Sequence, residues 1–240
     1  MGRIKRYRTA LSRHHRSRGF GIHSPYAFHF VCNVLREKNP YYCYDYLEDL
    51  RQAVIEELRG KKRHTRVISF KGLKMVFRIA NHFNPFCFMQ VGSCYGLTVA
   101  GMLSVSSSSR LLLYEPALDE FPVLAQVLAP YLDSVECYNS LPVAINDYKQ
   151  AVATGATAFV LINSIPLAHD IQPLQQYLLE LLNGDDNVLV LRNLNRDTSM
   201  HSLWLKLKAA MTCGQSFTNE KTGIIVVKKK LNLEHFFLWF

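Results

Sequence analysis

Apolar residues along this 240-residue chain occur in two recurring patterns. Short unbroken apolar runs predict strands that are buried on both faces, and apolar residues three or four positions apart predict amphipathic helices. Alternation of the two patterns is typical of an α/β fold with a largely parallel sheet. The expected strands cover residues 88–91, 111–115, 134–138, 158–162 and 187–191.

Polar residues mark the starts of the expected helices. Ser24 and Pro25 suit a helix start, because a serine side chain accepts a hydrogen bond from the first turn and proline fits its geometry. Four tyrosines between the first two helices either line a substrate pocket or cover the core. The helices are expected at 24–37, 45–59, 69–82, 170–182, after Gly96 and from Asp197, and the tyrosines are Tyr41, Tyr42, Tyr44 and Tyr46.

The most informative stretch is the glycine turn after the strand at 88–91. Gly92 lets the backbone bend at the strand end, Gly96 follows four residues later, and a helix then begins. Free N–H groups at such a helix start bind nucleotide-like ligands. A glycine turn without a ligand is the alternative, since many strand-to-helix turns use glycine simply to change direction.

An acid follows the next strand at the spacing of a nucleotide site. Glu115 stands 23 positions after Gly92, close to the roughly twenty residues that separate the glycine turn from a ribose-binding carboxylate in βαβ units. The alternative for Glu115 is a solvated carboxylate at a strand end. Together with the glycine turn, the spacing favours a ribose contact.

Polar pairs follow three further strands on the same side of the predicted sheet. Ligands of open α/β sheets bind at the carboxyl ends of the strands, so these pairs are candidates for the same site. Each pair is equally suited to capping a loop. The pairs are Asn139 with Ser140, Asn163 with Ser164, and Arg192 with Asn193.

Over residues 66–230 the order of these segments resembles the class I S-adenosylmethionine-dependent methyltransferases, in the branch related to catechol-type O-methyltransferases. The resemblance implies a Rossmann-like fold: a mostly parallel seven-stranded sheet, helices on both faces, and closing strands at 223–227 and 236–240. It implies S-adenosylmethionine as the cofactor. The implied cofactor site consists of Gln90, Gly92, Ser93, Gly96, Glu115, Asn139, Ser140 and Asn163.

The sequence departs from that family at three positions. Gln90 stands where the first motif has an acid, Asn163 where metal-dependent members have a carboxylate, and Arg192 where they have an Asp. A guanidinium carries a permanent positive charge, whereas hard cations need several oxygen ligands. We therefore expect no metal site. Arg192 would attract a carboxylate or phosphate on an acceptor, with an ion pair to a nearby acid as the alternative.

Two short segments are similar to a bacterial group within this branch: residues 21–26 and the pair Lys71 and Gly72. On that basis His23 is a candidate for acid–base chemistry, ahead of His29, and a structural histidine is the alternative. The candidate catalytic residues are His23, Asn163 and Arg192.

Charge is concentrated at the start of the chain. The formal net charge is +9, seven Lys or Arg lie in the first eighteen residues, and no acid precedes Glu37. Such a block is expected to be a solvated tail, with contact to nucleic acid or an anionic surface as the alternative. We expect a basic tail at 1–20, an N-terminal helical cap at 21–65 that packs over the cofactor end of the sheet, and the Rossmann-like domain at 66–240.

Composition adds the cellular context. The sequence contains no run of eighteen apolar residues, and its first residues are too basic and too poor in apolar residues for a secretory signal. Both observations favour a soluble, cytoplasmic protein without a transmembrane segment. The six cysteines include no C-x-x-C pair and are expected to be reduced.

Three functions remain open from the sequence. The first is a metal-independent S-adenosylmethionine-dependent methyltransferase acting on an unidentified small or medium acceptor. The second is a catalytically silent protein that keeps the methyltransferase fold for binding or regulation, which Gln90, Asn163 and Arg192 favour. The third is an RNA-binding methyltransferase that uses the basic tail.

Overall fold

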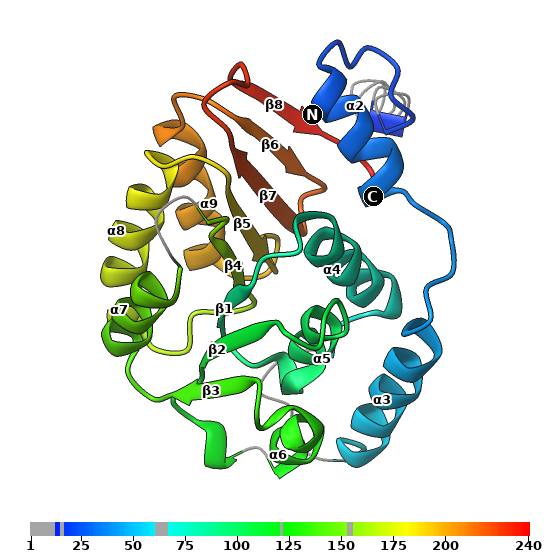
Figure 1. Cartoon of the computed structure of the whole chain (residues 1–240), viewed down its shortest axis with the longest axis vertical. Helices are drawn as coiled ribbons and strands as arrows, with labels where there is room; N and C mark the ends of the chain where they lie inside the picture. The colour runs from blue at the N-terminus through cyan, green and yellow to red at the C-terminus, as the bar shows by residue number, and fades with distance from the viewer. Residues whose placement is uncertain (1–12, 15–16, 61–66, 121, 153–155) are drawn as a thin grey trace.

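Figure 1 shows the computed structural model, which describes residues 13–14, 17–60, 67–120, 122–152 and 156–240. These residues form one eight-stranded sheet in the order β3-β2-β1-β4-β5-β7-β6-β8, with helices on both faces. The strands are β1 Cys87–Val91, β2 Arg110–Tyr114, β3 Val135–Tyr138, β4 Phe159–Ile162, β5 Asn187–Arg192, β6 Gln215–Thr218, β7 Thr222–Val227 and β8 Glu234–Phe237. The α/β class and the mostly parallel sheet are confirmed.

Strand direction places most loops that could bind a ligand at one edge. Strands β1 to β5 are mutually parallel, β7 alone is antiparallel to its neighbours, and β6 and β8 run in the same direction as β5. Every strand except β7 therefore ends at the same edge, which we call the carboxyl edge. The turn between β6 and β7 also lies there.

The expected number of seven strands was wrong by one. The strand that was not expected is β6, which lies between β7 and β8. Strand β8 overlaps the closing strand expected at 236–240 and pairs with β6 in parallel, so it covers main-chain groups that would otherwise be unpaired. Strand β6 itself did not stand out in the sequence, because three of its four residues are polar. Gln215 and Ser216 are nevertheless buried, and their side chains bond to Glu234 and His235 of β8.

Helix starts agree with the capping residues in the sequence. The Ser24 hydroxyl accepts a hydrogen bond from the Ala27 N–H, Ser69 accepts one from Gly72, and Asp197 caps the last helix. The first helix turns into a π-helix at Val31–Leu35. The α-helices are α2 Pro25–Phe30, α3 Tyr44–Glu57, α4 Phe70–Phe83, α5 Leu97–Leu103, α6 Pro122–Leu128, α7 Leu141–Ala151, α8 Ile171–Leu182 and α9 Thr198–Ala210.

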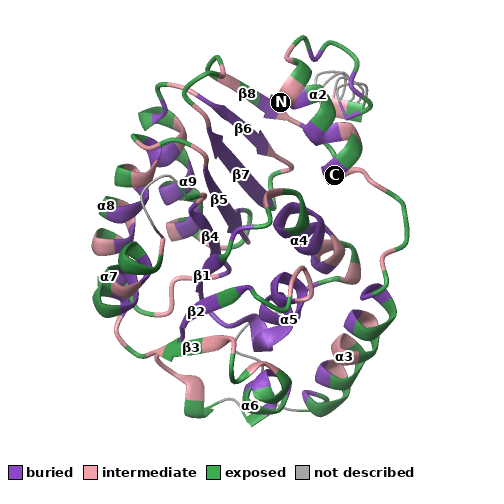
Figure 2. Ribbon diagram, viewed as in Figure 1, coloured by how far each residue is buried: buried purple, intermediate pink, exposed green. Residues whose placement is uncertain are grey.

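The sheet separates two apolar layers. Helices α4 and α5 cover one face, and α7, α8 and α9 cover the other (Figure 1). Alternate residues of each strand point to opposite layers: Phe88 and Phe159 pack edge to face in the first, while Met89 and Val160 lie in the second. Figure 2 shows the central strands buried throughout. No helix within the described ranges is long and apolar enough to cross a membrane.

The two N-terminal helices do not form a joint cap over the cofactor end of the sheet. Helix α2 packs on β6, where the rings of Phe30 and Phe217 are 4.9 Å apart. Its capping residue Ser24 accepts a hydrogen bond from Gln215, the first residue of β6 and thus the end opposite the carboxyl edge. Helix α3 instead contacts α4 and α5. The expectation of a joint cap fails for α2, because Phe30 packs in the same apolar layer as Phe217 of β6.

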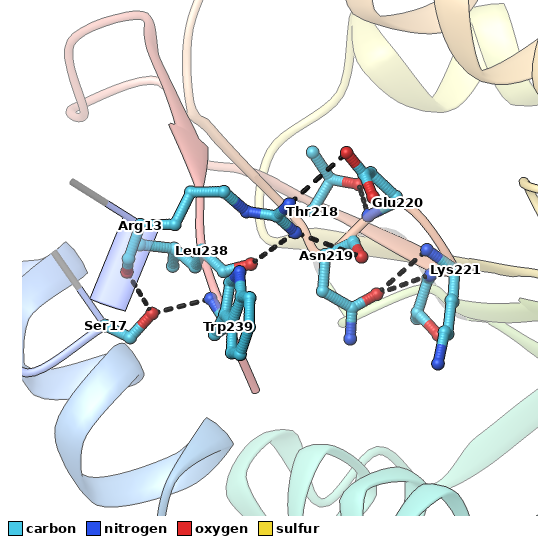
Figure 3. A network of polar contacts seen from close by, with 9 residues as sticks. Arg13, Ser17, Thr218, Asn219, Glu220, Lys221, Leu238 and Trp239 are labelled. Atoms are coloured by element: carbon cyan, nitrogen blue, oxygen red, sulfur yellow. Dashed lines mark hydrogen bonds and ion pairs between the residues drawn. The ribbon is translucent and has the colours of Figure 1, made fainter. Parts of the chain in front are cut away.

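Two described residues of the basic segment, Arg13 and Ser17, are packed rather than solvated, which corrects the expectation of a solvated tail at these two positions. Ser17 is buried, and its hydroxyl accepts a hydrogen bond of 2.6 Å from the Trp239 N–H. Arg13 donates to the main-chain oxygens of Leu238 and Asn219 (Figure 3). Main-chain acceptors near β8 attract this guanidinium, which a sequence pattern does not show. Residues 1–12 and 15–16 lie outside the described ranges.

Candidate functional site

The loop from Gly92 to Gly96 connects β1 to α5 in an unusual backbone conformation. The φ angles of Gly92, Cys94, Tyr95 and Gly96 are +78°, +49°, +57° and +78°. Positive φ is unfavourable for residues that carry a Cβ atom, and such conformations concentrate at functional sites. Gly92 is also crowded, because a Cβ atom there would lie 2.3 Å from the Ser164 hydroxyl. The loop is thus tightly specified at the carboxyl edge.

Glu115 lies directly after β2 and reaches this loop. Its Oε2 atom accepts a hydrogen bond of 2.8 Å from the Ser93 N–H, and 8% of the residue is exposed. No other described residue bonds to the carboxylate, so Oε1 keeps its acceptor capacity. The Glu115 N–H bonds to the oxygen of Tyr138, which places Asn139 and Ser140 on the neighbouring strand end. The structure brings the expected ribose and adenine positions together.

Gln90 supports the loop from behind. Its Nε2 donates to the main-chain oxygens of Gly92 and Ser93 at 3.0 and 3.1 Å, and its Oε1 accepts from the Thr98 hydroxyl at 3.0 Å. The residue is fully buried. Both N–H donors are used inside the protein, so the amide does not face a ligand. A carboxylate at this position could not donate these bonds.

Asn163 completes the same network from the end of β4. Its Nδ2 donates to the oxygen of Gly92 and to the hydroxyl of Thr98, both at 2.9 Å. Its Oδ1 accepts from Arg192 Nη1 at 2.6 Å. Every hydrogen-bonding atom of the amide thus has a protein partner. Asn163 fixes the loop rather than presenting its amide to a ligand.

Arg192, the last residue of β5, is a buried cation. Only 8% of it is exposed, and its hydrogen bonds to described residues all come from Nη1, which contacts Asn163 Oδ1 and Cys94 Sγ. Within the described ranges no acid forms an ion pair with it, so the alternative of a structural ion pair is not realised there. Arg192 also lines a cavity.

The residues at the ends of β4 and β5, which the sequence resemblance compares with a metal site, do not fit a cation. Arg192 Nη1 donates a hydrogen bond to the Asn163 amide oxygen, and the Asn193 amide donates one of 2.9 Å to the main-chain oxygen of Asn163. A divalent cation would need these oxygens free and would meet the guanidinium charge. These residues are therefore unsuited to holding a divalent cation.

The cavity beside Arg192 lies at the carboxyl edge and has a volume of about 670 Å³. Its wall is formed by the start of α4, the end of β5, the β6–β7 turn, the last residues of the chain and part of α3. Glu220 is its one acidic lining residue among those described, and it pairs with Arg13. Six cations line the cavity: Arg13, Arg51, Lys71, Arg192, Arg196 and Lys221.

Two sequence-based candidates lie away from this edge. His23 is exposed and precedes Ser24, which contacts the opposite end of β6, so the structure does not bring it to the site. Tyr41 and Tyr44 pack on Phe77 with ring distances of 4.9 and 5.7 Å and cover the core.

Ser164, a member of one of the expected polar pairs, packs against Gly92. Two further residues near the site did not stand out in the sequence. Arg13 reaches the cavity from the other end of the chain. Tyr114 precedes Glu115 and donates a hydrogen bond of 2.6 Å to Asp170, while burial and that carboxylate raise the pKa of its hydroxyl. Only contacts between distant segments reveal these residues, and no local pattern signals them.

Solved structures show the same architecture. No protein-family model matches the chain, and no curated protein matches it. The O-methyltransferase TomG from Streptomyces achromogenes, involved in tomaymycin synthesis and solved with S-adenosylmethionine, is 13% identical, with a TM-score of 0.53 over 82% of this chain and 95% of its own. An O-methyltransferase from Bacillus cereus, solved with S-adenosylhomocysteine, is 15% identical, with a TM-score of 0.54 over 82% and 95%.

A third neighbour is the methyltransferase PaMTH1 from Podospora anserina, solved with S-adenosylhomocysteine. It is 10% identical, with a TM-score of 0.55 over 80% of this chain and 99% of its own. Similarity at this identity establishes the fold. The chain shares the Rossmann-like α/β fold of these solved methyltransferase structures, with eight strands in its sheet.

Proposed function

We propose that the protein is an S-adenosylmethionine-dependent methyltransferase that acts without a divalent metal on a small or medium acceptor bearing an anionic group. One observation carries the proposal: Glu115 lies beside the strained loop after β1, with one carboxylate oxygen on Ser93 N–H and the other unpaired among described residues. That is the arrangement in which a carboxylate accepts bonds from ribose hydroxyls. The cofactors bound in the structural neighbours are consistent with it.

The residues around the loop divide into two roles. Glu115 Oε1 would accept from the ribose, while Asn139 and Ser140 flank the adenine. Gln90 and Asn163 hold the Gly92 oxygen and so keep the loop in its left-handed conformation. Replacing the amide side chain of Gln90 or Asn163 should therefore reduce both the order of the loop and the affinity for the cofactor.

The chain's part in methyl transfer is mainly positioning. When bound, S-adenosylmethionine supplies a methyl group already activated on a sulfonium. The protein holds an acceptor in line with that group and excludes water, effects that lower the barrier by fixing orientation. Arg192 lies at the boundary between the loop and the cavity, where its guanidinium can orient an anionic acceptor.

Calorimetric titration with S-adenosylhomocysteine tests the proposal. We expect binding, and Glu115→Gln should weaken it by about 1–3 kcal/mol because ribose hydroxyls lose a charged acceptor. Asp133→Asn, an exposed change of the same charge, should leave the affinity unchanged. Binding and activity should also survive a chelator. No binding at millimolar cofactor, or a strict need for added divalent metal, would contradict the proposal.

A catalytically silent binding protein remains the second candidate. Its support is that Gln90 and Asn163 are both fully engaged within the protein, which leaves fewer polar groups for a ligand than the family motif provides. This candidate predicts cofactor binding without turnover, or no binding.

A further inference from the structure

The cavity beside Arg192 has far more positive charge than the protein neutralises. Arg13 pairs with Glu220 and Arg51 with Glu48, whereas no described acid pairs with Lys71, Arg196 or Lys221. We propose that this cavity binds a phosphorylated small molecule with a planar ring, the phosphate lying against Arg192. The assignment names the acceptor class of the proposed methyltransferase and rests on that function, although the binding itself does not require the cofactor.

Arg192 is the anchor for the phosphate. Arg192 as a residue is only 8% exposed, and a buried guanidinium is unfavourable unless it is paired, because burial removes its hydration. Its protein partners are an amide oxygen and a thiol, both neutral groups that contact only Nη1. The N–H donors that remain form a planar fork, which matches two oxygens of one phosphate.

The first turn of α4 adds a second, independent set of donors. Ser69, Lys71 and Gly72 line the cavity, and α4 is 14 residues long. The first N–H groups of a helix lack partners inside it and favour an anion. Ser69 satisfies the Gly72 N–H only, so other N–H groups of the turn stay available. Lys71 extends from the same turn with an exposed charge.

One wall of the cavity is aromatic and suits a planar group. Trp239 lines it and is 52% exposed, which is high for a large aromatic residue, and Phe240 lies next to it. The Trp239 main chain is tied to Ser17, and the Arg13 guanidinium lies 5.6 Å from its ring (Figure 3). The Trp239 main chain is thus anchored beside the cavity, with a cation near the indole ring. An exposed aromatic face is suited to stacking.

Charge and size favour phosphate over a single carboxylate. Lys71, Arg192, Arg196 and Lys221 offer four positive charges without a described acidic partner, more than one carboxylate balances. A volume of about 670 Å³ is within the range of sites for small ligands. It admits a ring with one or two phosphates.

The test is a calorimetric titration of the full chain with 1-naphthyl phosphate, compared with 1-naphthol and with inorganic phosphate. We expect 1-naphthyl phosphate to bind about tenfold more tightly than either, because it alone engages both the donors and the aromatic wall. Its affinity should fall as ionic strength rises. Equal affinities for 1-naphthyl phosphate and 1-naphthol would overturn the proposal.

Variants locate the site. Arg192→Gln should lower the affinity by about tenfold or more, since it removes a charge-assisted hydrogen bond. Because this residue is buried, the double variant Lys71→Gln with Lys221→Gln provides a test on exposed side chains, with an expected loss of about tenfold. Lys230→Gln removes the same kind of exposed charge outside the cavity and should bind like the parent. An unchanged affinity in the double variant would place the phosphate elsewhere.

Two controls separate this proposal from the others. Titration with S-adenosylhomocysteine reports the cofactor site alone, so failure of that binding with retained 1-naphthyl phosphate binding overturns only the methyltransferase function. A 12-nucleotide single-stranded RNA serves as competitor. Pyrophosphate serves as a second competitor for comparison. Displacement of 1-naphthyl phosphate by this RNA at concentrations far below those at which pyrophosphate displaces it would replace the small-molecule assignment with an RNA site.

Discussion

The carboxyl edge of the sheet has two halves with opposite polar character. Over β1, β2 and β4, the polar groups satisfy one another: the Gln90 and Asn163 amides bond to the loop, and Glu115 accepts from Ser93. Over β5 to β8, cations line a cavity with one acid among the described residues. Internal pairing fixes the shape of the first half, and unpaired charge prepares the second for a ligand.

This difference between the two halves explains how the loop after β1 stays intact although Gln90 stands where the resembled motif has an acid. Replacing an acid by Gln90 supplies two N–H donors, and the oxygens of Gly92 and Ser93 accept both. Replacing a carboxylate by Arg192 has the reverse effect, because it adds donors that the protein does not satisfy. Substitutions that break the internal pairing of the first half should therefore affect folding as well as cofactor binding, whereas substitutions of the cavity cations should affect mainly the affinity for the cavity's ligand.

The largest expected effect is on folding at Gly92. We expect Gly92→Ala to lower the free energy of unfolding by about 3 kcal/mol, about 1 from the left-handed backbone and about 2 from crowding against Ser164. Gly60→Ala is the matched control, since Gly60 has a φ of +73° but open space around it. Its expected loss is about 1 kcal/mol. Urea denaturation measures both, and equal losses would show that Ser164 does not crowd Gly92.

An acid at position 90 should harm the loop. Gln90→Glu places a buried carboxylate against two main-chain oxygens, and we expect a loss of about 2 kcal/mol in unfolding free energy. Gln126→Glu, an exposed change on α6, should stay within about 0.5 kcal/mol of the parent. A Gln90→Glu protein as stable as the parent, or one that binds S-adenosylhomocysteine more tightly, would contradict this account of Gln90.

Arg13 should make a smaller contribution to stability. Arg13→Ala removes bonds to Leu238 and Asn219 and the contact with the Phe237 ring at 3.7 Å, which together are worth about 1–2 kcal/mol. Exposed Arg59→Ala should change little. Truncation through Arg18 should lower the melting temperature further, because it also removes Ser17. An unchanged melting temperature after that truncation would mean that the segment is dispensable.

The smallest expected effect is a shift caused by inorganic phosphate. At a concentration near its dissociation constant, a ligand of the folded state adds about 0.4 kcal/mol of stability, which is about 1 °C for a chain of this size. Scanning calorimetry in phosphate and in chloride at matched ionic strength measures it. The double variant Lys71→Gln with Lys221→Gln should lose the shift. A shift of equal size in that variant would indicate binding outside the cavity.

Much of the fold could be predicted from sequence because its signals are local. The apolar strands β1, β2, β4 and β5 and the capping residues Ser24, Ser69 and Asp197 appear where their patterns indicate. Strand β6 could not be predicted, since its polar residues are satisfied only by β8 and Ser24.

The location of the site residues could be predicted from the sequence, but the role of each side chain could not. The order of strands placed Gly92, Glu115, Asn163 and Arg192 at one edge, as parallel strands require. Whether an amide faces a ligand or the loop depends on contacts between distant segments. The cavity wall contributed by Arg13 depends on pairing across more than 200 positions, which no spacing rule reports.

The most direct test of the two-halves account is whether both halves can be occupied at once. We propose titrating 1-naphthyl phosphate into protein saturated with S-adenosylhomocysteine. The cavity lining includes neither the Gly92 loop nor Glu115, so the account predicts one further binding event, with an affinity within about threefold of that measured without the cofactor product. Loss of 1-naphthyl phosphate binding in the saturated protein would show a single shared site and would contradict the account.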